Sequence, residues 1–164
     1  MEVKLTKSLE DYLLAIDTLS KNSNSIIVKD VAVFLNIGGA STSDAIKKLK
    51  QKGFVNYEPY GHITLTPKGK EAVSLKKYRH NTITKFLNKV LDIEFKNAEY
   101  NAEQIEYSMT KDVLIRLVNF MDFMDQCSCS EPKWIKSCKA SLESGELCGN
   151  CKSCQGGCCC NGHK

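Results

Sequence analysis

The residues best suited to chemistry are nine cysteines, all of which lie between Cys127 and Cys160. Four of them form a C-x2-C-x2-C-x3-C run, namely Cys148, Cys151, Cys154 and Cys158. Thiolates at this spacing can hold a tetrahedral Zn(II) ion, and the spacing also suits an iron–sulfur cluster. Gly, Ser and Asn dominate after Ser141, so a disordered thiol-rich tail is a third interpretation. The run favours metal binding in general and does not decide which metal.

The cysteines are not expected to form a disulfide framework. Their odd number leaves one thiol over in any scheme of pairs, and residues 1–17 contain no continuous apolar segment of the kind that a secretory signal needs. We therefore expect a cytoplasmic protein in a reducing compartment, where clustered thiols more often bind metal than pair covalently. No apolar run approaches the ~20 residues that a membrane span needs, so no membrane association is expected.

A second group of candidate ligands lies in the middle of the chain. Glu103 and Glu106 are three residues apart, so both lie on one face of a helix expected from about Asn97 to Met109. His80 precedes Ile83 by three residues on the apolar face of a long helix that begins at about Pro67. Taken separately, the glutamates also fit a solvated acidic face and the histidine fits a core position.

The elements that must position these residues begin with a predicted winged helix-turn-helix. Two helices are expected at residues 8–19 and 28–35, followed by a turn at Gly38-Gly39 and a third helix from about 40 to 52. Two short strands, at residues 54–57 and 62–65, come next. Ser8 is the expected cap of the first helix, and Gly53 ends the third. Thr66-Pro67 starts the next helix, with Thr66 as the cap.

The third helix carries the expected contacts to double-stranded DNA. Its small hydroxyl residues can approach bases or phosphates, and its lysines can neutralise phosphates; they are Ser41, Thr42, Ser43, Lys47 and Lys48. Residues 1–80 hold 13 Lys/Arg against 8 Asp/Glu, a net charge of +5 that favours a polyanion partner. A solvated lysine face on an ordinary three-helix domain is the alternative, and Asp44 counts against DNA contact because its carboxylate repels phosphate.

The predicted fold class is mainly α. A winged helix-turn-helix domain is expected at residues 1–70, an all-helical dimerisation domain at 71–126 and a short Cys-rich tail at 127–164. The middle segment ends in a strongly apolar helix from Thr110 to about Met124. Three helices this apolar would leave surface uncovered in a monomer, so a homodimer is expected.

These motifs resemble the diphtheria-toxin-repressor and manganese-transport-regulator family of metal-dependent transcriptional regulators. The resemblance spans residues 5–126 and is carried by the winged helix together with Ser8-Leu9-Glu10-Asp11-Tyr12, Tyr78-Arg79-His80 and Ala102-Glu103-Gln104-Ile105-Glu106. It implies a divalent metal site between the DNA-binding and dimerisation domains, with ligands at Asp11, His80, Glu103 and Glu106. Carboxylate oxygens with one imidazole suit Mn(II) or Fe(II), and the oxygen-rich set is more similar to the manganese-type members.

The chain departs from the family pattern at three positions. Tyr107 stands where the family usually has a histidine, Leu14 replaces a second carboxylate of manganese-type members, and Thr84 replaces an ancillary glutamate of iron-type members. The second metal site of the family is therefore expected to be lost. Water or Tyr107 is a candidate further ligand to the remaining ion. Asp11 also has a structural explanation, because Ser8-x-x-Asp11 matches a capping box.

The resemblance implies a repressor of metal-uptake genes that is activated by Mn(II) or Fe(II). The rival hypothesis is a redox or metal-handling protein that works through the Cys-rich tail. A hybrid of the two is a regulator that senses iron–sulfur status or a soft metal through that tail. An enzyme is not expected, because the cysteines lack a recognisable catalytic context and the sequence contains neither a phosphate-binding loop nor a dinucleotide fingerprint.

Overall fold

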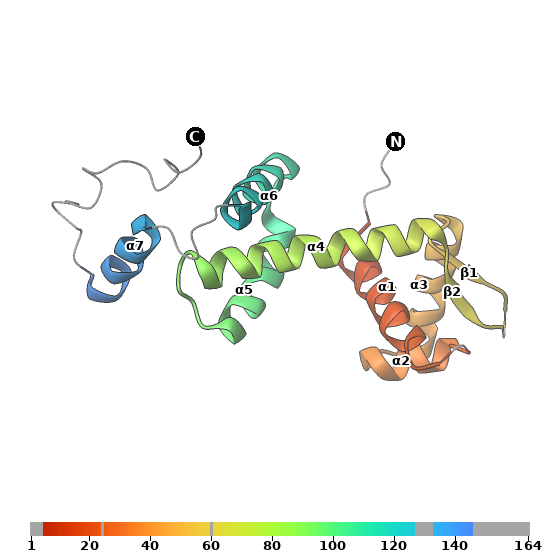
Figure 1. The fold of residues 1–164 in the computed structure, drawn as a ribbon. Coiled ribbons are helices and arrows are strands. Elements are labelled where there is room, and N and C mark those ends of the chain that lie inside the picture. The colour runs from red at the N-terminus through yellow and green to blue at the C-terminus, as the bar shows by residue number, and fades with distance from the viewer. Residues whose placement is uncertain (1–4, 24, 60, 127–132, 146–164) are drawn as a thin grey trace. The chain divides into compact units, whose positions relative to one another are not determined.

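The protein is mainly helical in its computed structural model, which describes residues 5–23, 25–59, 61–126 and 133–145. The elements follow in the order α1 (Lys7–Ser20), α2 (Val28–Leu35), α3 (Gly39–Gln51), β1 (Val55–Tyr57), β2 (Ile63–Leu65), α4 (Pro67–Lys89), α5 (Phe95–Ser108), α6 (Lys111–Gln126) and α7 (Lys133–Ser144). Figure 1 shows this succession along the chain. The predicted fold class, a winged helix-turn-helix followed by a helical domain, is confirmed.

The chain divides into two compact units, Met1–Lys77 and Tyr78–Lys164. The division falls inside α4, so one continuous helix contributes to both cores. The domain borders expected at residues 70 and 126 stay predictions.

The first unit is a three-helix core with a two-stranded wing. The apolar stripes of α1 and α3 face each other, and Leu13, Ile16, Ile46 and Leu49 are almost fully buried between them. The strands pair antiparallel in the register Val55 with Leu65 and Tyr57 with Ile63. The amide of Ile63 also donates to the Ile26 carbonyl at 2.8 Å, which fastens the wing to the segment before α2.

The junction between the wing and α4 has the predicted cap. The amide of Gly69 donates to the Thr66 hydroxyl at 3.1 Å, so Thr66 caps the helix and Pro67 occupies its first position. Gly69 is required by close packing, because a Cβ there would lie 2.1 Å from the Phe54 carbonyl oxygen. Gly53, at φ +75°, ends the turn after α3 as expected.

The predicted cap of the first helix is wrong. The helix begins at Lys7, so Thr6 takes the cap position and Ser8 lies inside the first turn. Ser8 and Asp11 therefore do not form the capping box that would have explained Asp11 structurally. At the start of α2, by contrast, the amide of the cap residue Ile27 donates a hydrogen bond to Oδ2 of Asp30 at 2.9 Å, as in a capping box.

The second unit packs the later turns of α4 against α5 and α6. Ile83 and Leu87 from α4 are buried against Ala98 and Ala102 from α5, whose small side chains allow close helix contact. Phe86 and Phe120 meet edge to face with ring centroids 6.2 Å apart. The helix α7 was not anticipated by the sequence analysis; it buries Ile135, and Lys139 lies 3.2 Å from Asp92.

Candidate metal centre and nucleic-acid interface

Glu106 is a buried carboxylate with one oxygen that has no hydrogen-bond partner among the described residues. Its side chain on α5 is only 2% exposed, and Nε of Arg79 donates to its Oε1 at 3.0 Å. Its Oε2 is buried and has no hydrogen-bond partner among the described residues. An ionised carboxylate oxygen left without a partner in the interior is costly, whereas a bound cation would satisfy it. A divalent cation at Oε2 would satisfy this single oxygen.

The other ligands predicted in the second unit are less enclosed. His80 is half-buried on α4, Glu103 is exposed on α5, and Tyr107 is half-buried beside them in sequence. No three His, Cys, Asp or Glu side chains among the described residues converge as a metal-binding group. Thr84, one turn after His80, is buried, and its hydroxyl has no hydrogen-bond partner in the described part of the chain.

Asp11 belongs to the first unit and is already engaged by a cation. Nζ of Lys76 lies 3.3 Å from Oδ1 of Asp11 and 3.6 Å from Oε2 of Glu10. Lys76 is buried, with a side chain only 8% exposed, whereas the Asp11 side chain is 38% exposed. Lys76 and Arg79 were not among the predicted site residues, although both lie shortly before His80 on α4.

The thiols of the predicted tail site, Cys148, Cys151, Cys154 and Cys158, lie outside the described residues. Cys138 in α7 is described as a half-buried free thiol. The tail site stays a prediction.

The expected DNA-contacting residues on α3 differ in their exposure. Ser41, Lys47 and Lys48 are exposed and Ser43 is half-buried. Thr42 is 0% exposed, and its hydroxyl donates to the Gly38 carbonyl at 3.1 Å. This burial leaves Thr42 no surface for a base or a phosphate, so its role here is to hold the start of α3, in contrast to the sequence expectation. Oδ1 of Asp44 lies 3.5 Å from Nζ of Lys47, so the two side chains form an exposed ion pair.

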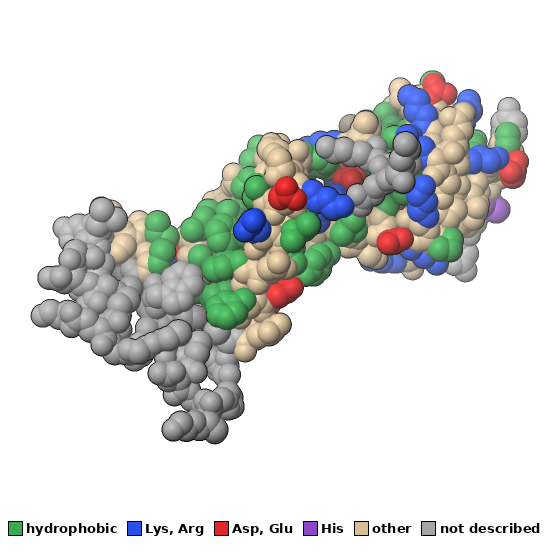
Figure 2. Space-filling view, turned by 90° about the horizontal axis from the view of Figure 1, so that it is seen from above, with side chains coloured by type: hydrophobic (Ala, Val, Ile, Leu, Met, Phe, Trp, Pro, Cys, Tyr) green, Lys and Arg blue, Asp and Glu red, His purple; other side chains and the backbone are tan. Residues whose placement is uncertain are grey.

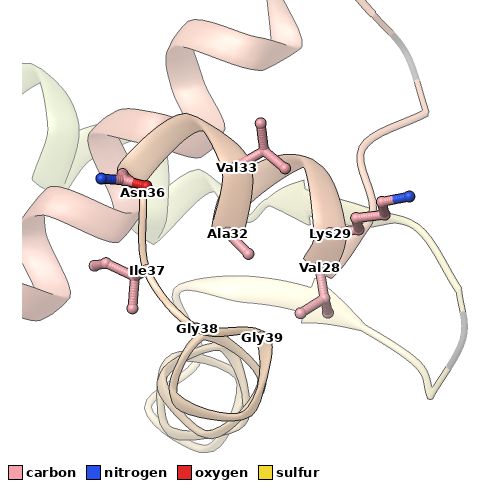
Figure 3. Close-up of a pocket in the computed structure, with 8 residues that line it drawn as sticks. All are labelled: Val28, Lys29, Ala32, Val33, Asn36, Ile37, Gly38 and Gly39. Carbon is pink, nitrogen blue, oxygen red and sulfur yellow. The ribbon is translucent and has the colours of Figure 1, made fainter.

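A hollow of about 580 Å³ lies between α2 and the turn that leads into α3. Figure 3 shows the residues that line it, which are Val28, Lys29, Ala32, Val33, Asn36, Ile37, Gly38 and Gly39. A Cβ at Gly38 or Gly39 would meet no atom within 4 Å, so the surface at the start of α3 is open.

The second unit exposes large apolar side chains. Of the residues in α6 only Met121 is buried, although the helix also carries Val113, Ile115 and Phe123, each of them about half exposed or more. Tyr100 and Phe95 on α5 are exposed as well. Green apolar surface is accordingly prominent in the space-filling view (Figure 2).

Each of the two units matches a known protein-family model. Residues 4–63 match the family model described as the iron dependent repressor, N-terminal DNA binding domain. Residues 66–135 match the model described as the iron dependent repressor, metal binding and dimerisation domain. Together the two matches cover the winged helix-turn-helix and the helical domain that follows it.

Individual relatives agree with the family models. The chain is 38% identical over 119 residues to an uncharacterized HTH-type transcriptional regulator of Methanocaldococcus jannaschii, covering 72% of this chain and 95% of the relative. It is 27% identical to the HTH-type transcriptional regulator MntR of Geobacillus thermodenitrificans, covering 74% of this chain and 85% of the relative.

Solved structures show the same fold. A manganese-dependent transcriptional repressor in complex with manganese superposes with a TM-score of 0.59 at 25% identity, covering 70% of this chain and 53% of that one. In the described residues no helix is long and apolar enough to cross a membrane. The family consists of DNA-binding regulators rather than enzymes, and its matches do not favour a protein that works mainly through its cysteine tail. The chain therefore belongs to the iron-dependent repressor family, the diphtheria-toxin-repressor and manganese-transport-regulator family of metal-dependent transcriptional regulators.

Proposed function

We propose that this protein is a homodimeric repressor of metal-uptake genes that binds its operator when Mn(II) or Fe(II) is bound by Asp11, His80, Glu103 and Glu106. It would act in the cytoplasm, where the operator DNA is. Water or Tyr107 would complete the coordination. Three carboxylates and one imidazole form a hard, oxygen-rich donor set that suits Mn(II) and Fe(II) better than it suits thiophilic metals.

The single observation that carries the proposal is the state of Glu106. Its carboxylate is nearly inaccessible, one oxygen accepts from Arg79, and the other is buried without a hydrogen-bond partner among the described residues. Buried polar atoms almost always have a partner in folded proteins, and an exception asks for an unseen ion or water. A divalent cation at Oε2 supplies that partner.

Metal would act on DNA binding by shifting a population. Asp11 lies in the first unit, and His80, Glu103 and Glu106 lie in the second. A cation that draws ligands from both units favours the arrangements in which those ligands can reach it. The shift in population is limited by the difference in metal affinity between the arrangements. In a dimer this selects the spacing of the two α3 helices that fits a palindromic operator.

The DNA contacts would come from α3 and the turn before it. Ser41, Lys47 and Lys48 are exposed there, Ser43 is accessible in part, and the glycine turn lacks side chains that would keep a phosphate away. Thr42 is left out of the proposed contact because it is buried.

A second copy of the chain is the proposed partner of the exposed apolar face of α6. Phe123 is 60% exposed and Val113 is 49% exposed, which is unusual for residues of a helix that is otherwise rich in Leu, Val and Met. The matched family model describes this region as a dimerisation domain. Replacing Phe123 with Lys should shift the protein from dimer to monomer in analytical ultracentrifugation, whereas Lys96→Ala on the exposed side of α5 should leave the dimer intact. A Phe123→Lys protein that stays dimeric would contradict the proposed interface.

The cysteine run carries a separate proposal, a thiolate-held Zn(II) ion or iron–sulfur cluster. The support is the sequence spacing of Cys148, Cys151, Cys154 and Cys158. Anaerobically purified protein should contain zinc, or iron with acid-labile sulfide, and a variant with all four cysteines changed to Ser should lose that metal. Equal metal content in the two proteins would reject the tail site.

Calorimetric titration of the metal-free full-length protein with Mn(II) tests the carboxylate site. Glu106→Gln keeps the size of the side chain and removes its charge, so we expect Mn(II) affinity to fall at least about tenfold. Glu99→Gln removes the same charge from an exposed position on the same helix and is the matched control. Equal losses in the two variants would indicate a general charge effect and would contradict the assignment of Glu106.

A further inference from the structure

Lys76 carries a buried ammonium group that has no role in the metal site proposed above. It lies on α4 with a side chain only 8% exposed, and its Nζ lies 3.3 Å from Oδ1 of Asp11 and 3.6 Å from Oε2 of Glu10. A buried lysine keeps its charge only where carboxylates compensate for the lost hydration. The two carboxylates of α1 provide that compensation, and Lys76 in turn neutralises them.

The charge of Asp11 is therefore offset by a cation of the protein itself. The sequence alone suggests that the ligand carboxylates repel one another in the metal-free protein. The structure instead shows Asp11 and Glu10 held by one protein cation. A divalent ion that coordinates Asp11 would come within a few ångströms of the same ammonium group, and two cations at that separation repel strongly in a partly buried site.

We propose that Lys76 is an internal counter-cation that competes with the metal for Asp11 and so sets the metal concentration at which the protein responds. The inference rests on the proposed function, because it takes Asp11 as a metal ligand. Lys76 occupies Asp11 in the metal-free protein and has to release it when the ion binds. The measured affinity is then the intrinsic affinity reduced by the fraction of molecules in which Asp11 is already released.

Arg79 provides the contrast that makes this role specific to Lys76. Its Nε donates to Oε1 of Glu106, whereas Oε2 of that carboxylate keeps no hydrogen-bond partner among the described residues. Arg79 can therefore stay in place when an ion binds at Oε2, and it holds the carboxylate in position. At Asp11 the ammonium group and the metal compete for the same partly exposed carboxylate. At Glu106 the guanidinium and the metal can bind different oxygens of a buried carboxylate.

Substitution of Lys76 by Met tests the competition. Met keeps an unbranched side chain of similar length for packing and removes the charge. Losing a charge-assisted contact to Asp11 should make Mn(II) bind roughly tenfold more tightly in calorimetric titration of the full-length protein. The matched control is Lys77→Met, which removes the same charge from the adjacent residue, whose partner is Asp17. Affinity that is unchanged or weaker relative to the Lys77→Met protein would overturn the proposal and show that Lys76 supports the site instead.

Two further variants keep the test decisive. If Lys76→Met does not give the wild-type circular dichroism spectrum, Lys76→Gln removes the charge while it retains a polar end group, and it should also tighten Mn(II) binding. Lys76→Arg keeps the charge and should stay near the wild-type affinity. A Gln variant that binds no more tightly than the Arg variant would overturn the competition.

The Asp11→Asn protein separates a failure of this inference from a failure of the proposed function. If Asp11→Asn binds Mn(II) as tightly as the wild type, Asp11 is not a ligand and the proposed site fails at that residue. If Asp11→Asn loses affinity and the Lys76 variants do not gain any, the site stands and only the competition is refuted.

Discussion

Nε of Arg79 donates to Oε1 of Glu106 at 3.0 Å, and Oε2 of the same buried carboxylate has no hydrogen-bond partner in the described part of the chain. The arginine thus offsets the charge of the glutamate and leaves one oxygen available. The ion pair with Arg79 lowers the cost of burying this carboxylate, and Oε2 is left as a donor atom for a cation.

Loss of Arg79 should destabilise the metal-free protein more than it affects the metal-bound one. Arg79→Leu leaves Glu106 as an uncompensated buried charge, so the free energy of unfolding in chelator should fall by about 3 kcal/mol. Added Mn(II) should restore part of that loss, because the ion compensates the same carboxylate. Urea denaturation measures both values. Arg116→Leu, an exposed site on α6, is the control, and an equal effect of the two changes would contradict a special role for Arg79.

The packing of α4 against the wing should not tolerate a larger residue at Gly69. A Cβ there would lie 2.1 Å from the Phe54 carbonyl oxygen, so Gly69→Ala must displace backbone and should cost about 2 kcal/mol in thermal or urea unfolding. Gly39→Ala is the matched change inside a helix with no atom within 4 Å of the new Cβ, and it should be neutral or stabilising. Similar unfolding midpoints for the two variants would contradict the close packing of Gly69 against the Phe54 carbonyl.

Lys48 should contribute to DNA affinity without contributing to sequence preference. Removing one phosphate contact with Lys48→Ala should weaken binding to all DNA sequences and reduce the slope of log affinity against log salt by about one. Fluorescence anisotropy at several salt concentrations gives that slope. Lys96→Ala, an exposed lysine of α5, should leave the slope unchanged. An unchanged slope for Lys48→Ala would place the DNA-binding surface elsewhere.

The link between α4 and the end of α6 should depend on pH. A hydrogen bond from Lys89, with the charge of Lys85, lowers the pKa of Asp125 below its ordinary 3.8. Because the pKa is lower in the folded state, the stabilisation is present above the unfolded pKa and is lost as pH falls through the folded value. Asp125 is exposed, so Asp125→Asn should lower the free energy of unfolding by less than about 1 kcal/mol at pH 7. Below the folded-state pKa of Asp125, the substitution should leave that free energy unchanged. A difference in unfolding free energy between the two proteins that grows on acidification would contradict this linkage.

Much of the fold follows from local sequence patterns. The helical periodicity of residues 8–19, the glycine after α3 and the Thr66-Pro67 start of α4 each correspond to a feature of the structure, because short-range spacing and capping determine them. The cap at Ser8 was wrong because two suitable hydroxyl residues, Thr6 and Ser8, lie close together and sequence cannot tell which one precedes the first turn. Helix α7 was missed because its apolar residues are few and the cysteine pattern dominates that segment.

The candidate site was only partly predictable. The spacing of Glu103 and Glu106 shows that they share a helix face, but it cannot show that Glu106 is buried while Glu103 is exposed. The roles of Lys76 and Arg79 depend on contacts with residues 65 and 27 positions away, respectively, which no local pattern reveals. Thr42 illustrates the opposite error, because a hydroxyl residue at the start of α3 fits both DNA contact and a bond to the preceding turn, and its burial decides between them.

The most direct test of the central claim is binding of the full-length protein to DNA from its own promoter region, measured without oxygen in chelator, Mn(II), Fe(II) and Zn(II). Wild type and the variant with Ser at positions 148, 151, 154 and 158 are compared. We expect both proteins to bind tightly only with Mn(II) or Fe(II), and Glu106→Gln to lose that response. A response to metal that disappears with the four cysteines and survives Glu106→Gln would contradict the account and place metal sensing in the tail.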